Sequence, residues 1–187
     1  MTVGNTLTKP LTIDEFEELD LPEDREWELH HGELVGVTFP DLIHRRLQQR
    51  IVEILQSLFP DAEVLMEFPF QIKERLELRS ADVGVAGPGR VPSAAETRLT
   101  GAPDFVVEAL SPSNSLPKLK QYRRLCFESG TSVFWMVDPD DNTVDVYLKD
   151  QKLHRVWECG EEIPVALFGR QVGVRVDEIF RGITLPH

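Results

Sequence analysis

The sequence predicts an α/β fold: a mixed central sheet flanked by helices, with antiparallel strands at the C-terminal end. Helical patterns alternate with short apolar runs that are typical of buried strands. The apolar run 105–110, a helical pattern over 116–129 and the run 131–137 follow one another in the order of a right-handed βαβ crossover, so these two strands should be parallel. Turn residues separate the runs 143–148 and 153–157, as expected for an antiparallel pair.

The first third of the chain predicts a short helix, a hairpin and a long helix. Thr12 and Glu15 have the spacing of a capping box, which starts a helix. Two alternating runs around Gly32, within 27–35, predict a hairpin. Over 41–59 apolar residues recur every three or four positions, so we expect an amphipathic helix with one face in the core.

The remaining elements follow from apolar runs bounded by turn residues. Gly130 stands where a helix that ends at Ser129 would place a left-handed residue. The segment 87–101, with two prolines, is expected to be a long loop. We expect strands at 63–68, 70–73, 82–86, 105–110, 131–137, 143–148, 153–157 and 172–176, and helices at 116–129 and 177–180.

Length and composition favour one domain over 1–187, with residues 1–10 flexible. No apolar run approaches the roughly 20 residues that span a membrane, and the N-terminus lacks the core of a signal peptide. Cys126 and Cys159 have no metal-ligand spacing. We therefore expect a cytoplasmic protein.

The net charge of −12 argues against a general nucleic-acid binder, because neutralisation of phosphate dominates that kind of affinity. Basic residues nevertheless cluster locally, at 44–46 with Arg50 and again over 118–124. Clusters of this size are more often ordinary solvated helix faces than binding sites.

Asp82 and Glu108 are the leading candidates for function. Each lies in an apolar, strand-like run, and charged side chains are rare in buried strands unless they are paired or bind a metal. Two strands that each carry one inward carboxylate suit a hard divalent cation such as Mg²⁺. The alternative is a pair of carboxylates that only make structural hydrogen bonds.

Four blocks of sequence, each with its own spacing, carry a resemblance to a known family. They are Trp-Glu-Leu-x-x-Gly-Glu-Leu from Trp27, Ala-Asp-Val-x-Val from Ala81, Ala-Pro-Asp-Phe-Val-Val-Glu-x-Leu-Ser-Pro-Ser from Ala102, and Gly-(x)₄-Trp-x-Val-Asp-Pro from Gly130. Together they resemble the bacterial family of putative restriction-endonuclease-like proteins, a branch of the PD-(D/E)xK nuclease superfamily. The resemblance spans roughly residues 11–147.

The resemblance implies a restriction-endonuclease-like domain around a central four-stranded mixed sheet. It also implies catalytic roles for Glu28, Asp82 and Glu108, with Asp82, Glu108 and the carbonyl of Ala109 as ligands for Mg²⁺ or Mn²⁺. DNA is the implied substrate. Nucleases of this kind often act as dimers, and the C-terminal strand region near Trp157 is a candidate for pairing two subunits.

The chain departs from the family pattern at the catalytic lysine. The superfamily's position two residues after the glutamate is Leu110, and the family's position eight residues before Gly130 is Tyr122. Lys118 lies one turn earlier on the helix face of Tyr122 and is our choice for the catalytic cation. Lys120 points about 160° away from Tyr122 and is a poorer candidate.

Three functions therefore remain open from the sequence: a Mg²⁺-dependent DNA endonuclease, a catalytically impaired scaffold that binds nucleic acid or protein, and a nuclease that acts on RNA. A basic groove near the two carboxylates would favour a nuclease over the scaffold. No histidine has the partners of a zinc site, and no nucleophile elbow or P-loop is present.

Overall fold

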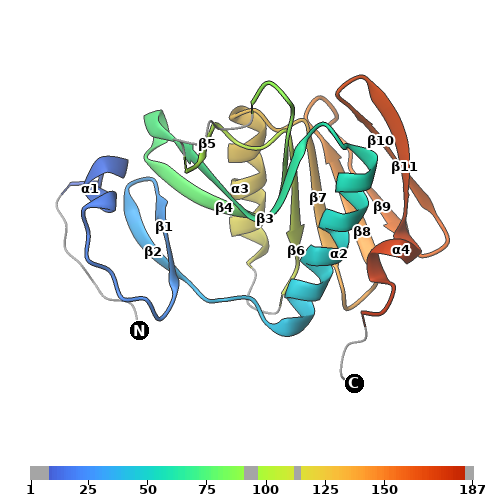
Figure 1. The fold of residues 1–187 in the computed structure, drawn as a ribbon, viewed down its shortest axis with the longest axis horizontal. Coiled ribbons are helices and arrows are strands. Elements are labelled where there is room, and N and C mark those ends of the chain that lie inside the picture. The colour runs from blue at the N-terminus through green and yellow to red at the C-terminus, as the bar shows by residue number, and fades with distance from the viewer. Residues whose placement is uncertain (1–8, 91–96, 112–114, 184–187) are drawn as a thin grey trace.

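The structure, a computed structural model, describes residues 9–90, 97–111 and 115–183 (Figure 1). The expectation of a flexible segment at 1–10 falls almost entirely on residues outside these ranges. The described helices are α1 (Ile13–Glu17), α2 (Leu42–Leu58), α3 (Leu116–Glu128) and α4 (Val176–Phe180), with a 3₁₀ turn at Lys73–Arg75. None of these helices is both long and apolar enough to cross a membrane.

The described strands form one large mixed sheet and one separate hairpin. The large sheet has the order β2-β1-β4-β6-β7-β8-β9, with β3 also on β4 and β5 on β3; β10 and β11 form the hairpin. The strands are β1 (Glu26–His30), β2 (Glu33–Val37), β3 (Glu63–Ile72), β4 (Glu77–Ala86), β5 (Leu99–Thr100), β6 (Phe105–Ala109), β7 (Val133–Asp138), β8 (Thr143–Leu148), β9 (Arg155–Glu158), β10 (Glu162–Leu167) and β11 (Arg170–Arg175).

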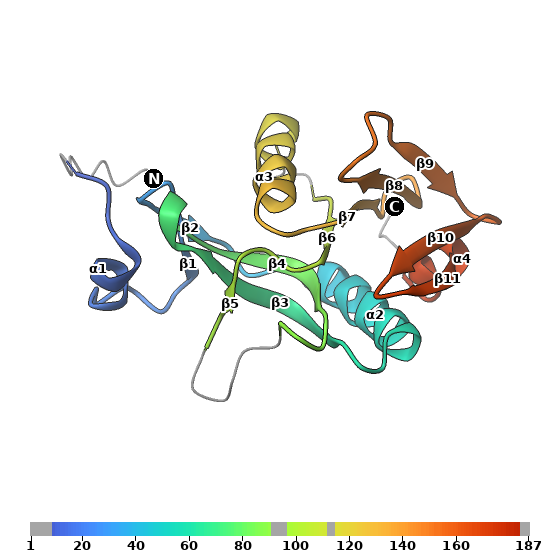
Figure 2. The same ribbon diagram turned by 90° about the horizontal axis from the view of Figure 1, so that it is seen from above.

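The two long helices cover opposite faces of the sheet (Figure 2). On one face, Leu47, Ile51 and Leu55 of α2 pack on β4, β6 and β7, and the hairpin β10–β11 with α4 extends the same core. On the other face, Leu119 and Leu125 of α3 belong to a second core. A mixed sheet between helices, with antiparallel strands at the C-terminal end, confirms the predicted fold class. The described sheet is larger than the four strands that the resemblance implies.

The local signals at the helix ends and the crossover are confirmed. Thr12 and Glu15 form a full capping box, with each side chain bonded to the other residue's main-chain N–H. Asp41 caps α2 through the N–H of His44 at 2.8 Å. Gly130, with φ of 132°, follows α3. β6 and β7, the strands before and after α3 in the sequence, pair in parallel, as the βαβ order predicts.

Several strand predictions are wrong, and proline explains two of them. β3 is one strand rather than two. Beyond it, within the described ranges, only the short β5 pairs, at Phe70 and Gln71, and Pro69 is tolerated near such an edge. Pro164 similarly conceals β10, which among the described strands pairs only with β11. β5 lies within the segment expected to be a loop. β4 begins at Glu77, five residues before the predicted start at Asp82.

Gly84 of β4 tests the packing beside the site. A Cβ at this position would lie 2.6 Å from Cβ of Phe68, closer than packed carbon atoms approach, and Phe68 is itself buried. We expect Gly84→Ala to lower the free energy of unfolding by about 1–3 kcal/mol, the usual cost of overpacking. Chemical denaturation measures this, and Gly89→Ala is the control because nothing lies within 4 Å of its added Cβ. Equal stability of the two variants would contradict the packing described here.

Candidate active site

The candidate site occupies the place where β4 changes its neighbour in the sheet. β4 pairs with β6 at Val83–Val85 and with β1 at Leu78. Between these two stretches, carboxylates bind the main-chain N–H groups of β4. The N–H of Ser80 donates to Oε1 of Glu28 at 2.8 Å, and the N–H of Asp82 donates to Oε1 of Glu108 at 3.2 Å. The side chains of Glu28 and Glu108 thus take the place of inter-strand backbone hydrogen bonds where β1 and β6 diverge from each other.

Asp82 and Glu108 are held together by reciprocal hydrogen bonds. Asp82 receives the N–H of Ala109 at its Oδ2, at 2.7 Å, while its own N–H binds Glu108. The register of β4 on β6 places the two residues opposite each other, just beyond the pair Val83–Val107. Opposed residues of an antiparallel pair lie close on one face of a sheet. The expectation that these carboxylates lie on neighbouring strands is confirmed.

Helix α2 contributes two further polar groups to Asp82. Gln48, only 1% exposed, donates from Nε2 to Oδ1 of Asp82 at 3.1 Å and to Oε1 of Glu67 at 2.5 Å. Nε2 of His44, one turn earlier, lies 3.1 Å from Oδ2 of Asp82. His44 and Gln48 share a helix face because they are four residues apart.

Glu67 lies opposite Asp82 in the register of β3 on β4, at a residue where β3 is distorted. Its φ of 46° is left-handed, and the ladder between β3 and β4 runs from Met66–Val83 to Phe68–Ala81 without pairing Glu67 to Asp82. Residues other than glycine rarely adopt this backbone conformation, so the position is strained. The register and the shared donor Gln48 place this third carboxylate next to the pair.

The electrostatics of the cluster show an excess of negative charge. Removal from water, and next the charge of Asp82, raise the pKa of Glu108 well above its usual value. Removal from water also raises the pKa of Glu67, although the bond from Gln48 opposes the shift. Burial would lower the pKa of His44, but its contact with Asp82 and the charges of Glu67 and Asp41 outweigh burial and raise it. The carboxylates therefore favour any positive charge that enters the site.

Arg79 and Tyr122 lie beside Glu28, the predicted catalytic acid on β1. Nε of Arg79 donates to Oε2 of the fully buried Glu77 at 2.7 Å, and its Nη1 is 3.8 Å from Oε2 of Glu28. The guanidinium lies over the ring of Tyr122, 5.6 Å from its centroid. The hydroxyl of Tyr122 donates to the carbonyl of Ser80 at 3.2 Å. Residue 122, the family's lysine position, thus faces the site as a buried phenol.

The structure brings most of the predicted residues together. Asp82, Glu108 and Ala109 are directly bonded, and Glu28 joins them through Ser80 and is close enough to contribute to the raised pKa of Glu108. Lys118 is different: it is exposed near the start of α3. The catalytic and metal-binding roles of all these residues stay predictions.

Four residues at the site are not evident from the sequence alone: His44, Gln48, Glu67 and Arg79. One local signal points to Gln48, which lies between Leu47 and Ile51 on the apolar face of its helix, where an uncharged polar residue needs a buried partner. The lack of metal-ligand spacing around His44 does not exclude it from the site, because His44 contacts the carboxylate of Asp82 rather than a metal. Glu67 and Arg79 carry no local signal, since the register between strands and contacts with a neighbouring strand place them.

The donor atoms fit a hard divalent cation. No group of three or more His, Cys, Asp or Glu residues in the described ranges forms a complete metal cluster. Mg²⁺, however, commonly takes one or two carboxylates and keeps several waters. Each carboxylate oxygen has two lone pairs, so the present hydrogen bonds of Asp82 and Glu108 leave acceptor capacity. Burial first, and after it the charge of Asp82, raise the pKa of Glu108, and a cation bound there would offset that charge.

Comparison with known proteins agrees with the resemblance in the sequence. Residues 13–179 match the family Uma2, described as "Putative restriction endonuclease". The chain belongs to this family. A crystal structure described as a putative nuclease belonging to DUF820, from Anabaena variabilis ATCC 29413, matches with a TM-score of 0.79 and 26% identity, over 94% of this chain and all of that one. Among curated proteins, none matches this chain. Family and solved structure both support a nuclease.

Gln48 tests how the carboxylates are held. In Gln48→Leu the volume is similar, but Asp82 and Glu67 lose a shared donor. We expect a loss of about 1–3 kcal/mol in unfolding free energy, the usual cost of leaving buried polar groups unsatisfied. Thermal or chemical denaturation measures it. The control is Gln49→Leu, an exposed neighbour, for which a change within about 0.5 kcal/mol is expected. If Gln48→Leu proves as stable as the wild type, these hydrogen bonds do not constrain the site.

Proposed function

We propose that the protein is a divalent-metal-dependent endonuclease that hydrolyses DNA phosphodiester bonds. The observation that carries the proposal is the pairing of Asp82 with Glu108, each of which binds a main-chain N–H of the other's strand. Membership of a restriction-endonuclease family supports nucleic acid as the substrate. Restriction endonucleases act on DNA, so we place DNA before RNA.

In this proposal Asp82, Glu108 and the carbonyl of Ala109 hold Mg²⁺ or Mn²⁺. When bound, such an ion offsets phosphate charge and lowers the pKa of water. The chain itself fixes the two carboxylates on rigid strands and holds Asp82 from α2 through Gln48 and His44. Glu28 is proposed as the third acid. Orientation by buried partners of this kind is what preorganises an active site.

The positive charge opposite the scissile phosphate has two candidate sources. Lys118 remains our proposal, because its long stem can carry an ammonium from an exposed helix position toward a bound phosphate. Arg79 lies closer to Glu28 but is already engaged by Glu77, a fully buried carboxylate. An arginine held in this way neutralises the buried carboxylate of Glu77 and is less available to bind a phosphate.

A catalytically impaired scaffold is the second candidate function. The specific observation in its favour is Tyr122, which occupies the family's lysine position as a buried group bonded to Ser80. Burial first, with contributions from Cys126 and the nearby acids, raises the pKa of Tyr122 well above its usual value, so the phenol stays neutral. A neutral donor cannot offset charge on a phosphate as an ammonium does.

A homodimer and a cytoplasmic location are further parts of the proposal. The alternating apolar residues of β10 and β11 are buried within the chain, where they extend the core between α2 and the sheet. Trp157, on the outermost described strand of the large sheet, is half-buried under the stacked guanidinium of Arg155. Pairing of subunits would therefore use the edge of β9 near Trp157 rather than the buried face of β10.

Asp82→Asn tests metal dependence. We expect the wild type to cut duplex DNA with Mg²⁺ or Mn²⁺, and the variant to lose at least about 10³-fold in rate, because a metal ligand supplies several kcal/mol of transition-state stabilisation. Calorimetric titration should show metal binding by the wild type but not by the variant. Asp61→Asn, at an exposed position, is the charge-matched control. A wild type that neither binds metal nor cuts DNA would leave the scaffold as the better description.

Lys118→Ala tests the proposed cation. Loss of an electrostatic stabiliser typically costs about 10²–10³ in rate, so the variant should fold and bind metal normally but cut DNA that much more slowly. Lys120→Ala removes the same charge from the same helix on another face and should cut DNA as the wild type does. If the two variants behave alike, Lys118 has no special role.

A further inference from the structure

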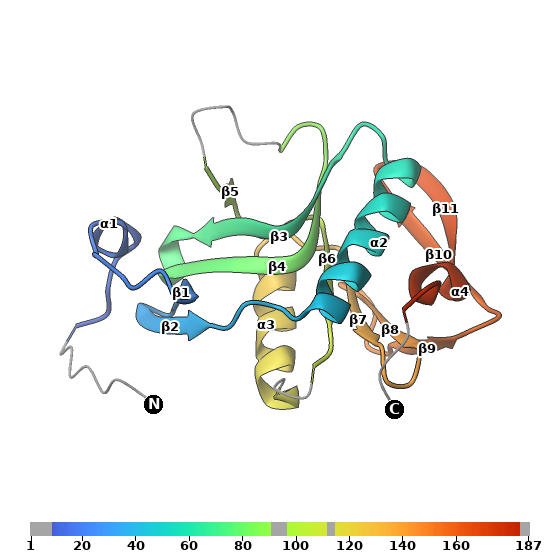
Figure 3. The same ribbon diagram turned by 60° about the horizontal axis from the view of Figure 1, so that its bottom comes forward.

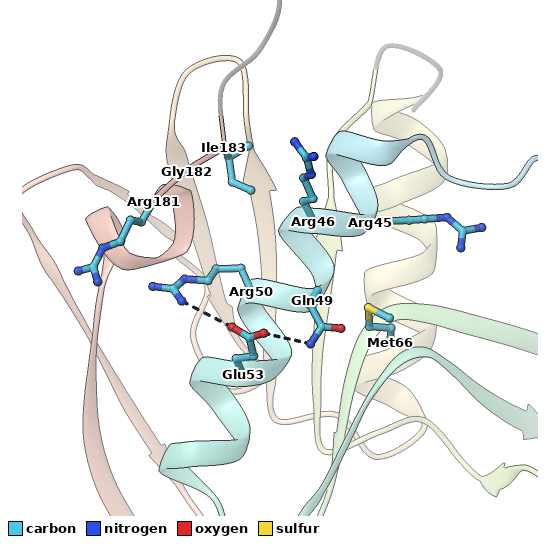
Figure 4. A pocket seen from close by; sticks show the side chains of 9 residues that line it. All are labelled: Arg45, Arg46, Gln49, Arg50, Glu53, Met66, Arg181, Gly182 and Ile183. Atoms are coloured by element: carbon cyan, nitrogen blue, oxygen red, sulfur yellow. Dashed lines mark hydrogen bonds and ion pairs between the residues drawn. The ribbon is translucent and has the colours of Figure 1, made fainter.

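A groove of about 420 Å³ runs along the outer face of α2, between β3 and the end of α4 (Figure 4). Its walls carry four arginines, Arg45, Arg46 and Arg50 from α2 and Arg181 from the segment after α4, together with Met66 of β3. Four of the 20 basic residues of a chain with net charge −12 thus line one groove. The groove is therefore positively charged, although the chain as a whole carries a net negative charge.

Two of these arginines are available to a ligand. Arg46 is exposed and makes no hydrogen bond or ion pair with any described residue, and Figure 4 shows its side chain directed away from the others. The side chain of Arg181 is 66% exposed and has only a 3.5 Å contact with Glu178. Arg50 differs, since its Nε donates to the carbonyl of Glu178 at 2.9 Å and ties α2 to α4. One carboxylate, Glu53, faces Arg50 at 3.5 Å.

The groove adjoins the carboxylate site through two neighbouring pairs of residues. Arg45, on the α2 wall of the groove, directly follows His44 in the sequence, and Met66, on the β3 wall, directly precedes Glu67. His44 and Glu67 both belong to the candidate site. On a helix with 3.6 residues per turn, Arg45 lies between the face of His44 and the outer face that carries Arg46 and Arg50. A bound chain could therefore contact both regions.

We propose that this arginine groove binds the sugar-phosphate backbone of duplex DNA and positions it for the carboxylate site, an inference that rests on the proposed endonuclease function. The helix segment from Arg45 to Glu53 rises about 12 Å. Measured along the axis of duplex DNA, that length corresponds to roughly three to four base-pair steps, each of which carries one phosphate on either strand. Arginine suits phosphate because its planar guanidinium binds two oxygens at once.

The experiment measures binding without cleavage. A fluorescent DNA duplex of about 20 base pairs is titrated with protein in EDTA, by anisotropy, over a series of salt concentrations. Each phosphate contact contributes about −0.9 to the slope of log affinity against log salt. Arg46 and Arg181, the two available arginines, together contribute about −1.8 to this slope when each neutralises one phosphate.

Arg46→Ala and Arg181→Ala should each make the slope less steep by about 0.9. Between 1 M and 0.1 M salt this change amounts to about 8-fold weaker binding for each single variant and about 60-fold for the double variant. Glu53→Gln should strengthen binding, because it removes a repulsive charge from the groove and releases Arg50. Lys73→Ala is the control. It removes one positive charge at the tip of the β3–β4 hairpin, seven residues or about 23 Å along the strand direction from Met66 (Figure 3).

The outcomes separate this inference from the proposed function. Unchanged slopes in Arg46→Ala and Arg181→Ala, or absence of duplex binding by the wild type, overturn the groove even if Asp82-dependent cleavage is observed. Arginine-dependent binding without cleavage in Mg²⁺ or Mn²⁺ supports the groove and removes the endonuclease. Duplex RNA of equal length is the competitor: if it binds equally well with the same arginine dependence, the assignment to duplex DNA is wrong. An acidic peptide that displaces DNA only at the groove, and binds more tightly, would identify a protein partner instead.

Discussion

The site depends on one constraint, which is that strand β4 cannot pair with β6 and β1 along its whole edge. β6 takes Val83–Val85 and β1 takes Leu78, so the N–H groups of Ser80 and Asp82 need other acceptors. Buried main-chain donors without partners cost free energy comparable to a lost hydrogen bond. Glu28 and Glu108 supply those acceptors. The same carboxylates thus complete the sheet and form the candidate active site.

This dual use explains why the acids can be crowded together. Burial raises the pKa values of Glu108 and Glu67, the charge of Asp82 raises both further, and all three acids are held by donors from other elements. Gln48 binds two of them from α2, and Ala109 binds Asp82 from β6. Replacing one donor therefore affects the sheet, the helix and the charge balance at once. A divalent cation would relieve the repulsion without disturbing these bonds, since carboxylate oxygens keep spare lone pairs.

The sequence predicts those parts of the molecule whose causes are local. Capping residues define α1 and α2, the glycine after α3 marks its end, and the run from 105 to 137 predicts the parallel pair that carries Glu108. The acids on central strands also stand out, because charge is unusual there. What the sequence does not show depends on the register between distant segments. Glu67 lies opposite Asp82 because of the register of β3 on β4, and no pattern within β3 indicates that register.

The overall charge of −12 does not oppose a polyanionic ligand as strongly as composition suggests. Exposed charges are screened beyond about 8–10 Å at physiological salt, so distant acids contribute little at a groove lined by arginines. A phosphate in the proposed groove would meet Arg46 and Arg181, and one at the candidate site would meet the carboxylates around Asp82. The first region attracts a phosphate. The second repels it unless a cation is present, because the charges are buried and weakly screened. A chain with this distribution would bind a nucleic-acid backbone beside its acids without metal, and would bring a phosphate onto them only with metal. On the proposed function, separate basic and acidic regions, rather than net charge, would therefore determine what the chain binds.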